Sequence, residues 1–249
     1  MERQRCGTGD LEPGASSPGR IRARGLLDMG GRRGDIKDRR ARAIVKLAAE
    51  PALWSPWRRG EEMTLRRIEL TVGSAPIGAA QTWSYPSDDL KRYSIPTYSM
   101  QVKGVNGRGI PVMQTFEVIR FGVHRKSPTD KTTVVGLADS QKYVIQAWLP
   151  SYTVHSARSE ERGAWLVFAN YLIHDGPDDP QNQVYATAGC IEICRGPRGF
   201  DAFNDLVIAL SGSTKPTRGE QLDQIGRSGV MSLHYVKAAR PPLVEWTGP

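Results

Sequence analysis

A histidine and a cysteine sixteen positions apart are the residues of this sequence best suited to chemistry. His174 ends an apolar run, and Cys190 follows the small residues Thr187, Ala188 and Gly189. A thiol is a good nucleophile only as a thiolate, and a neighbouring imidazole is the usual means of producing one. The glycine before the cysteine would let the backbone approach a bound carbonyl, where amide N–H groups can hold an oxyanion. The spacing therefore predicts nucleophilic catalysis by Cys190 with His174 as its base.

The elements that must position these two residues are predominantly strands. From Met63 onward, runs rich in Val, Ile, Tyr, Phe, Trp and Thr alternate with Gly, Pro, Asn and Asp, as in a β-rich domain. The predicted strands cover residues 65–72, 97–103, 115–124, 132–137, 143–149, 163–173, 184–187, 191–193 and 230–236. The most apolar of them, 163–173, is expected at the centre of the sheet and leads directly into His174.

A change of hydrophobic period after Cys194 predicts a helix. Its apolar face is formed by Phe200, Phe203, Leu206, Val207 and Leu210, and it ends at Gly212. A second, short helix is expected over 220–225. The sequence thus predicts a mainly β domain with a few short helices.

The first quarter of the chain has a different composition. Residues 1–62 hold 14 Lys and Arg against 9 Asp and Glu, so they carry +5 of the net charge of +8. Aromatic and β-branched residues are rare before Arg40, as in disordered segments, and a weak helix is predicted over 39–54. We therefore expect a disordered or weakly helical basic leader, 1–62, and one β-rich catalytic domain, 63–249. A flexible arm and a start-site artefact, with translation beginning at Met63, are alternative explanations of the leader.

Charge and cysteine content argue against several classes of protein. Most of the basic excess lies outside the domain that carries His174 and Cys190, which disfavours a basic catalytic groove for nucleic acid. Three cysteines are too few for a disulfide scaffold, and the CxxxC spacing of Cys190 and Cys194 is unusual for zinc. No apolar run is long enough for a transmembrane segment, and no ordinary secretory signal is visible. Neither nucleic acid, nor a metal, nor an organic cofactor is expected.

The segment from residue 174 to residue 193 resembles the signature of the L,D-transpeptidase catalytic domain, the YkuD-like family. That signature is a histidine, a gap in the mid-teens, and then Ser/Thr-His-Gly-Cys followed by a hydrophobic residue and an arginine. The matching residues are His174, Thr187, Gly189, Cys190 and Ile191. The resemblance extends over roughly residues 110–236 and implies an L,D-transpeptidase-like β-sandwich.

The sequence departs from this signature at three positions. Ala188 stands where the family usually has a second histidine, Glu192 where it usually has arginine, and Asp175 where glycine is more common. The arginine belongs to the family's substrate-handling surface, and Arg195 and Arg198 are the candidates to replace it here. Divergent relatives without a signal peptide include secreted antibacterial effectors, which suits the absence of such a signal in this chain.

The resemblance implies a cysteine acyltransferase or peptidase that acts on peptidoglycan stem peptides through a Cys190 thioester. His174 would take the thiol proton or hold a thiolate–imidazolium pair, oriented by Asp175 or by a backbone carbonyl. The backbone N–H of Cys190, with that of Gly189 or Ala188, would hold the oxyanion. The candidate substrate-binding residues are Thr187, Ala188, Arg195, Arg198 and His155.

Several outcomes of such a reaction are open at this stage. Water as acceptor would give L,D-carboxypeptidase activity, and an amine would give transpeptidation or D-amino acid exchange. The site of action would be the periplasm or cell envelope, reached by a route other than an ordinary signal peptide; otherwise the protein is cytoplasmic. The alternative from another class is a non-catalytic β-rich binding module in which Cys190 is a small buried hydrophobe. The oligomeric state is left open.

Overall fold

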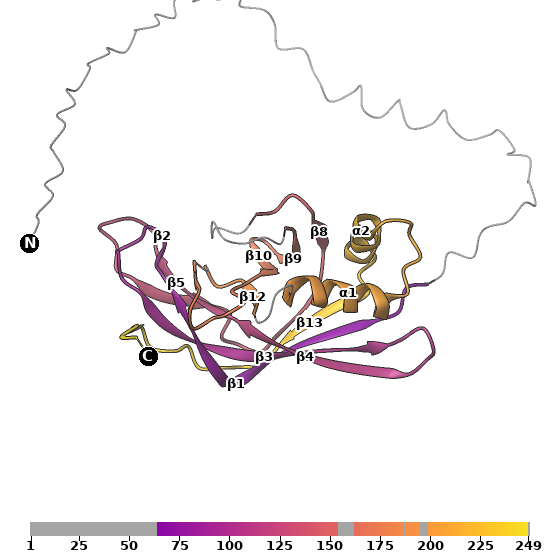
Figure 1. Ribbon diagram of the computed structural model, residues 1–249, viewed down its shortest axis with the longest axis horizontal. Coiled ribbons are helices and arrows are strands. Elements are labelled where there is room, and N and C mark those ends of the chain that lie inside the picture. The colour runs from indigo at the N-terminus through magenta and orange to yellow at the C-terminus, as the bar shows by residue number, and fades with distance from the viewer. Residues whose placement is uncertain (1–63, 154–161, 187, 195–198, 249) are drawn as a thin grey trace, which may run out of the picture. The chain divides into compact units, whose positions relative to one another are not determined.

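Strands are the commonest regular structure in the described chain, as its alternating apolar and polar residues predict. The computed structural model describes residues 64–153, 162–186, 188–194 and 199–248 (Figure 1). Of these residues 45% lie in strands and 14% in helices, which confirms the prediction of a mainly β protein with a few short helices. The predicted leader, 1–62, and the helix predicted within it lie outside the described residues.

The elements in the described ranges follow a simple order, with all but two strands preceding the helices. They are β1 (Ile68–Thr82), β2 (Tyr85–Pro86), β3 (Tyr93–Val105), β4 (Pro111–Ile119), β5 (Phe121–Arg125), β6 (Thr133–Gly136), β7 (Gln141–Val144), β8 (Ala147–Leu149), β9 (Ala164–Phe168), β10 (Tyr171–Asp175), β11 (Val184–Tyr185), β12 (Ile191–Cys194), α1 (Gly199–Ser211), α2 (Arg218–Ser228), β13 (Met231–Tyr235) and β14 (Val244–Glu245).

The main sheet is strongly curved, and the strands at its two ends are neighbours in the chain. Its strand order is β7-β13-β1-β3-β4-β12-β10-β9-β8, with β11 joining β1 and β14 joining β3. The end strands β7 and β8 are separated in the chain only by Ile145 and Gln146. The Ile145 N–H donates to the Met231 carbonyl in β13 at 2.9 Å, and the Gln146 N–H donates to the Leu166 carbonyl in β9 at 2.8 Å. The predicted strand 143–149 is therefore two strands, each paired to a different end of the sheet.

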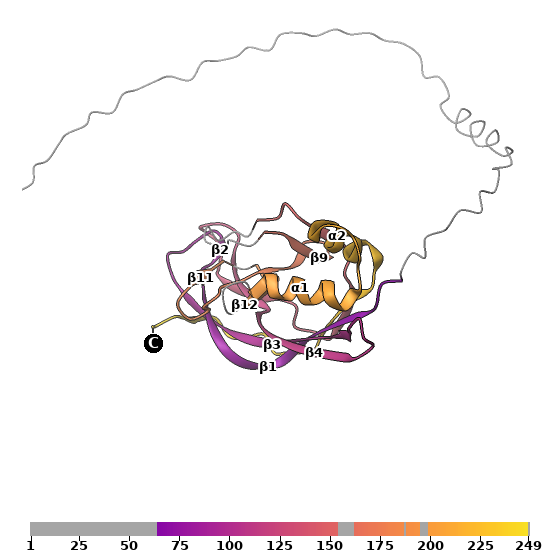
Figure 2. The same cartoon turned by 45° about the vertical axis from the view of Figure 1, so that its right-hand side comes forward.

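The helix α1 lies on the inner side of this curved sheet in both views (Figures 1 and 2). The stripe predicted from the 3.6-residue period is buried there: Phe200, Phe203 and Val207 are 0% exposed. Burial of such a side chain contributes about 1.5–3 kcal/mol. The second helix, α2, starts at a Thr217–Glu220 capping box, and its C-cap is a left-handed Gly229.

The predicted central strand 163–173 is wrong in two respects. It is a hairpin of β9 and β10, turned at Ala169, whose φ is 46°, and it lies near the β8 end of the strand order. The sequence offers no glycine or proline at this turn. Because both arms are apolar, composition alone could not show the reversal.

The predicted strand 115–124 is also two strands, divided at the fully buried Arg120. β4 belongs to the main sheet, and β5 belongs to a three-stranded sheet of order β2-β5-β6. The Arg120 guanidinium donates to the backbone carbonyls of Gly73, Leu137 and Val236 at 2.6–2.9 Å. Burial lowers the pKa of Arg120. Each hydrogen bond from a charged donor contributes about 1.5–3 kcal/mol, so this residue ties three segments together.

No helix within the described residues is long and apolar enough to cross a membrane.

Candidate active site

Strands β10 and β12 bring a histidine and a glutamate side by side. The two strands are parallel, with Ile173 opposite Ile191 and His174 opposite Glu192. Successive residues of a strand point to opposite faces, and the two isoleucines pack into the main hydrophobic core. His174 and Glu192 therefore share the other face. Both are buried, at 2% and 0% exposure.

A backbone carbonyl holds the His174 ring. Nδ1 of His174 lies 2.7 Å from the carbonyl oxygen of Asp175. A carbonyl only accepts hydrogen bonds, so Nδ1 carries the hydrogen and Nε2 is the basic nitrogen of the neutral ring. The ring of Tyr152 packs against the imidazole at a centroid distance of 5.4 Å. Of the two orienting groups considered from the sequence, the backbone carbonyl makes this contact.

The Cys190 sulfur lies against the backbone of the strand that carries His174. Cys190 immediately precedes β12 and is partly exposed. Its Sγ is 3.7 Å from the Asn170 carbonyl, and it accepts a hydrogen bond from the Leu172 N–H. His174 lies two residues beyond Leu172, about 7 Å along an extended strand. In this resting arrangement the thiol is directed at the Asn170 carbonyl.

The turn before Cys190 is one that only glycine can form. Gly189 has a φ of +96°, and a Cβ on it would lie 2.8 Å from the Cα of Gly136. Gly136 has a φ of +134°, and its own Cβ would lie 2.6 Å from the Arg120 carbonyl oxygen. Two glycines packed against each other thus fix the position of the thiol-bearing turn on the end of β6. Ala188 is exposed at the same turn.

The surroundings of the sulfur favour a neutral thiol. Burial raises the pKa of Cys190 to about 11; the Leu172 N–H opposes this rise, and the negative charge of Glu192 adds to it. Burial also raises the pKa of Tyr152, with further contributions from Cys190 and Glu192. Cys194 is 2% exposed and belongs to a second apolar cluster, and burial raises its pKa as well.

Four of the residues predicted from the sequence lie on the paired strands β10 and β12 or in the turn just before β12. His174, Asp175, Gly189 and Cys190 lie there, with Ala188 beside them. The remaining predicted residues lie outside the described residues; they are Thr187, Arg195, Arg198 and His155.

Sequence reasoning missed the parts of the site that come from tertiary contacts. Tyr152, Asn170 and Gly136 carry no motif, so no signal could have found them. Glu192 had a signal, since it is a charged residue inside the apolar segment Ile191–Cys194. Two cavities of about 660 Å³ and 470 Å³ occur elsewhere, and neither is lined by His174 or Cys190. Within the described ranges, no group of three His, Cys, Asp or Glu residues is arranged to hold a metal ion.

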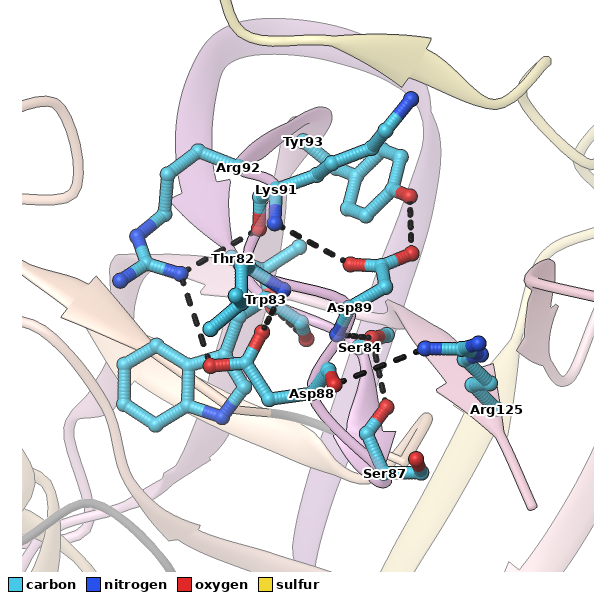
Figure 3. Close-up of polar contacts among 11 residues, drawn as sticks. Thr82, Trp83, Ser84, Ser87, Asp88, Asp89, Lys91, Arg92, Tyr93 and Arg125 are labelled. Carbon is cyan, nitrogen blue, oxygen red and sulfur yellow. Dashed lines mark hydrogen bonds and ion pairs between the residues drawn. The ribbon is translucent and has the colours of Figure 1, made fainter. Parts of the chain in front are cut away.

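A second polar cluster, centred on Asp89, lies in the loop between β1 and β3 (Figure 3). The Asp89 carboxylate accepts hydrogen bonds from the Tyr93 hydroxyl and, at 2.8 Å, from the Thr132 hydroxyl. The Lys91 N–H donates to it at 3.2 Å. Burial acts to raise the pKa of Asp89, but these hydrogen bonds together with Ser84 lower it to about 2. Its charge is fully matched by donors, as in a structural loop anchor.

Comparison with known proteins finds no family model, no curated protein and no solved structure that matches this chain. The resemblance of residues 174–193 to the L,D-transpeptidase signature is therefore carried by the residues themselves, and it enters below as a proposal.

Proposed function

We propose that the protein is a cysteine acyltransferase or peptidase of the L,D-transpeptidase type. It acts on peptidoglycan stem peptides through a thioester on Cys190. One observation carries the proposal: the Cys190 sulfur rests on the backbone of β10, two residues from a histidine whose Nδ1–H is held by a carbonyl. The chemistry rests on these contacts, and the stem peptide as substrate rests on the signature resemblance.

The reaction begins with proton transfer from Sγ to Nε2 of His174 while the sulfur attacks an amide carbonyl carbon. The tetrahedral intermediate then collapses, its C–N bond breaks, and the leaving amine takes the proton from His174. Water or an acceptor amine next attacks the thioester and gives a proton to His174. The C–S bond breaks, and the sulfur recovers that proton. Every proton and electron pair is accounted for without a cofactor.

The raised pKa of Cys190 supports general-base catalysis over a preformed thiolate–imidazolium pair. A thiol with a pKa of about 11 is neutral at physiological pH, so its proton has to move during the attack. This movement requires a change of the Cys190 side-chain rotamer from the Asn170 carbonyl toward His174. Catalytic hydrogen bonds commonly tighten only when substrate is bound. The exposed Ala188 borders the turn that carries Cys190.

The experiment is incubation with defined muropeptides followed by intact mass spectrometry. Loss of a terminal D-Ala, a swapped D-amino acid and a dimer distinguish carboxypeptidase, exchange and transpeptidase activities. Cys190→Ala should remove both the product and the acyl adduct, whereas Cys194→Ala, the matched control, should keep them because Cys194 lies in an apolar cluster. An adduct that persists in Cys190→Ala, or no product from wild type with any muropeptide, contradicts the proposal.

A non-catalytic β-rich binding module is the second candidate. The observation that favours it is the resting contact of the Cys190 thiol with a backbone carbonyl, together with its raised pKa. Alkylation of the free protein does not separate the two candidates, since both predict a slow reaction at pH 6. Binding of muropeptides with no turnover and no adduct would favour the binding module.

A further inference from the structure

We infer that Glu192 is a positioning residue that stabilises the protonated form of His174 during acyl transfer. The inference rests on the proposed function, and it adds a third group to Cys190 and His174. Nothing in the sequence pattern assigned this role, because Glu192 is simply the charged residue of an apolar strand.

The first support is the register of the two strands. His174 and Glu192 are direct partners in a parallel pair, so their side chains leave neighbouring backbones on the same face, about 5 Å apart. Ala164 on β9 flanks His174, and Ile119 on β4 flanks Glu192. An imidazole and a carboxyl group are thus enclosed between small or apolar neighbours. Electrostatic interactions are strong in such a place, because little water is present to screen them.

The second support is the set of side chains whose pKa values are raised by the charge of Glu192. Its negative charge raises the pKa of four titratable side chains. Tyr152 and Tyr185 come from two other segments of the chain, and Cys190 and Cys194 flank Glu192 in its own segment. Asp175 and Asp178 act on Tyr185 and Cys194 from the same side, and the Glu117 carboxyl lies beside Cys194 on β4. Glu192 is therefore close to both reacting groups, whereas the other carboxylates do not act on Cys190.

The role follows from how charge moves in the reaction. An ionised Glu192 disfavours a thiolate on Cys190 and favours an imidazolium on His174. During acylation the negative charge passes from sulfur to the substrate oxygen, and the positive charge stays on His174. Glu192 thus opposes a free thiolate in the resting protein and stabilises the imidazolium that is present in the transition state. The same carboxylate therefore keeps the thiol protonated in the resting protein and stabilises the imidazolium that forms when the sulfur attacks.

The test is Glu192→Gln, read out in two ways that should move in opposite directions. Loss of the charge should lower the pKa of Cys190, so alkylation at pH 8 should become severalfold faster. Acyl transfer should become roughly 10- to 100-fold slower, because Glu192 would supply only part of a general acid–base effect of about 10²- to 10⁴-fold, and the pH–rate profile should change shape. Glu192→Asp, which keeps the charge, should recover part of the rate. A merely structural role would slow both reactions together and leave the profile unchanged.

The matched control is Glu117→Gln. Glu117 is a buried carboxyl one strand away that accepts a hydrogen bond from Thr97, and its change should leave the pH profile as in wild type. Should Glu192→Gln fail to fold, NMR titration of the His174 ring in wild type decides. An imidazolium that persists above about pH 6.5, the ordinary midpoint, supports the inference, and one lost below that midpoint overturns it.

The outcomes separate this inference from the proposed function. Acyl transfer in Glu192→Gln at the wild-type rate, with the same pH profile, overturns the inference and leaves the proposed function standing. No acyl transfer in wild type removes the proposed function. The alkylation and NMR measurements then still show whether Glu192 acts on Cys190 and His174.

Discussion

The Asp89 cluster and the His174–Cys190 site shift the pKa values of their ionisable groups in opposite senses: the first favours the charged form and the second the neutral form. Asp89 is surrounded by hydroxyl and amide donors, and its pKa falls to about 2 (Figure 3). At the candidate active site burial dominates, and the pKa of Cys190 rises to about 11. Donors that match a charge stabilise it in the folded protein and fix a loop. Burial that opposes a charge leaves a group whose charged form arises only during a reaction, and such groups are candidates for catalysis.

The two regions also differ in how the chain builds them. The Asp89 cluster is formed largely by neighbours in sequence, residues 82–93, with Thr132 and Arg125 added from nearby strands. The candidate site depends on pairing between β10 and β12 and on a glycine contact with β6. A substitution in the Asp89 cluster should therefore change the free energy of unfolding. A substitution at the candidate active site should change the rate of acyl transfer.

The largest effect that would sharpen this contrast is expected from Gly189→Ala. The new Cβ would lie 2.8 Å from the Cα of Gly136, and φ at this position is +96°. The turn has to move, so we expect a loss of about 2–4 kcal/mol in the free energy of unfolding. Acyl transfer should fall by about 100-fold or more, because a displacement of about 1 Å at a reacting group has that effect. Urea unfolding and muropeptide turnover measure the two quantities.

Gly109→Ala is the control for backbone conformation alone. Gly109 has a φ of +76°, but nothing lies within 4 Å of a Cβ placed there. Gly109→Ala should lower the free energy of unfolding by about 1 kcal/mol and leave muropeptide turnover unchanged. Equal effects of the two substitutions would show that the contact with Gly136 does not position Cys190.

The sequence predicted the parts of the fold that depend on local periodicity. The apolar face of α1 repeats every 3.6 residues, so the buried Phe200 and Phe203 could be identified without a structure. The reversal at Ala169 and the division at Arg120 were missed, because Asn170 was the sole turn-forming residue at the first, within a long apolar run, and Arg120 has no turn signal at all. The buried arginine is stable only because Gly73, Leu137 and Val236 present their carbonyls, and those are far apart in the chain.

In the candidate site, too, the local features could be predicted from the sequence and the tertiary contacts could not. The spacing of His174 and Cys190 was visible because it is a local motif, and so was the flexibility of the turn at Gly189. The orientation of the histidine by a backbone carbonyl and its pairing with Glu192 depend on the register of β10 and β12. Tyr152 reaches His174 from a separate segment of the chain. No pattern in the sequence encodes these contacts, since each arises only when strands are paired.

A smaller effect, on stability alone, is expected from Asp89→Asn. The folded-state pKa of Asp89 is about 2, lowered from 3.8, so its carboxylate stabilises the fold above about pH 4. This contribution is lost as the pH falls from about 4 to about 2. The site is partly solvated, so we expect about 1 kcal/mol at pH 7 after allowance for screening. Urea unfolding at pH 7 and at about pH 1.5 should show a clear difference between wild type and variant at the higher pH and almost none at the lower one, where the carboxyl is protonated in both states.

The exposed Asp139 provides the control for Asp89. Asp139→Asn should follow wild type at both pH values. The rate of Cys190 alkylation should be the same in wild type and in Asp89→Asn. A change in that rate would show that the two regions are coupled and would break the contrast between them.

The smallest effect is expected from Tyr152→Phe, which tests how the site is covered rather than how it reacts. The ring packs on His174 at 5.4 Å, and its phenol lies near enough to Cys190 and Glu192 for their charges to raise its pKa. Phenylalanine keeps the ring and removes only the hydroxyl, so turnover should change by about threefold or less. Tyr152→Ala also removes the cover of the buried imidazole, and because Tyr152 is only partly buried it should cost about 1–3 kcal/mol in the free energy of unfolding, less than a core aromatic. If Tyr152→Phe instead abolished turnover, the hydroxyl would itself take part in proton transfer, and the Cys190–His174 pair would not be the whole of the reacting machinery.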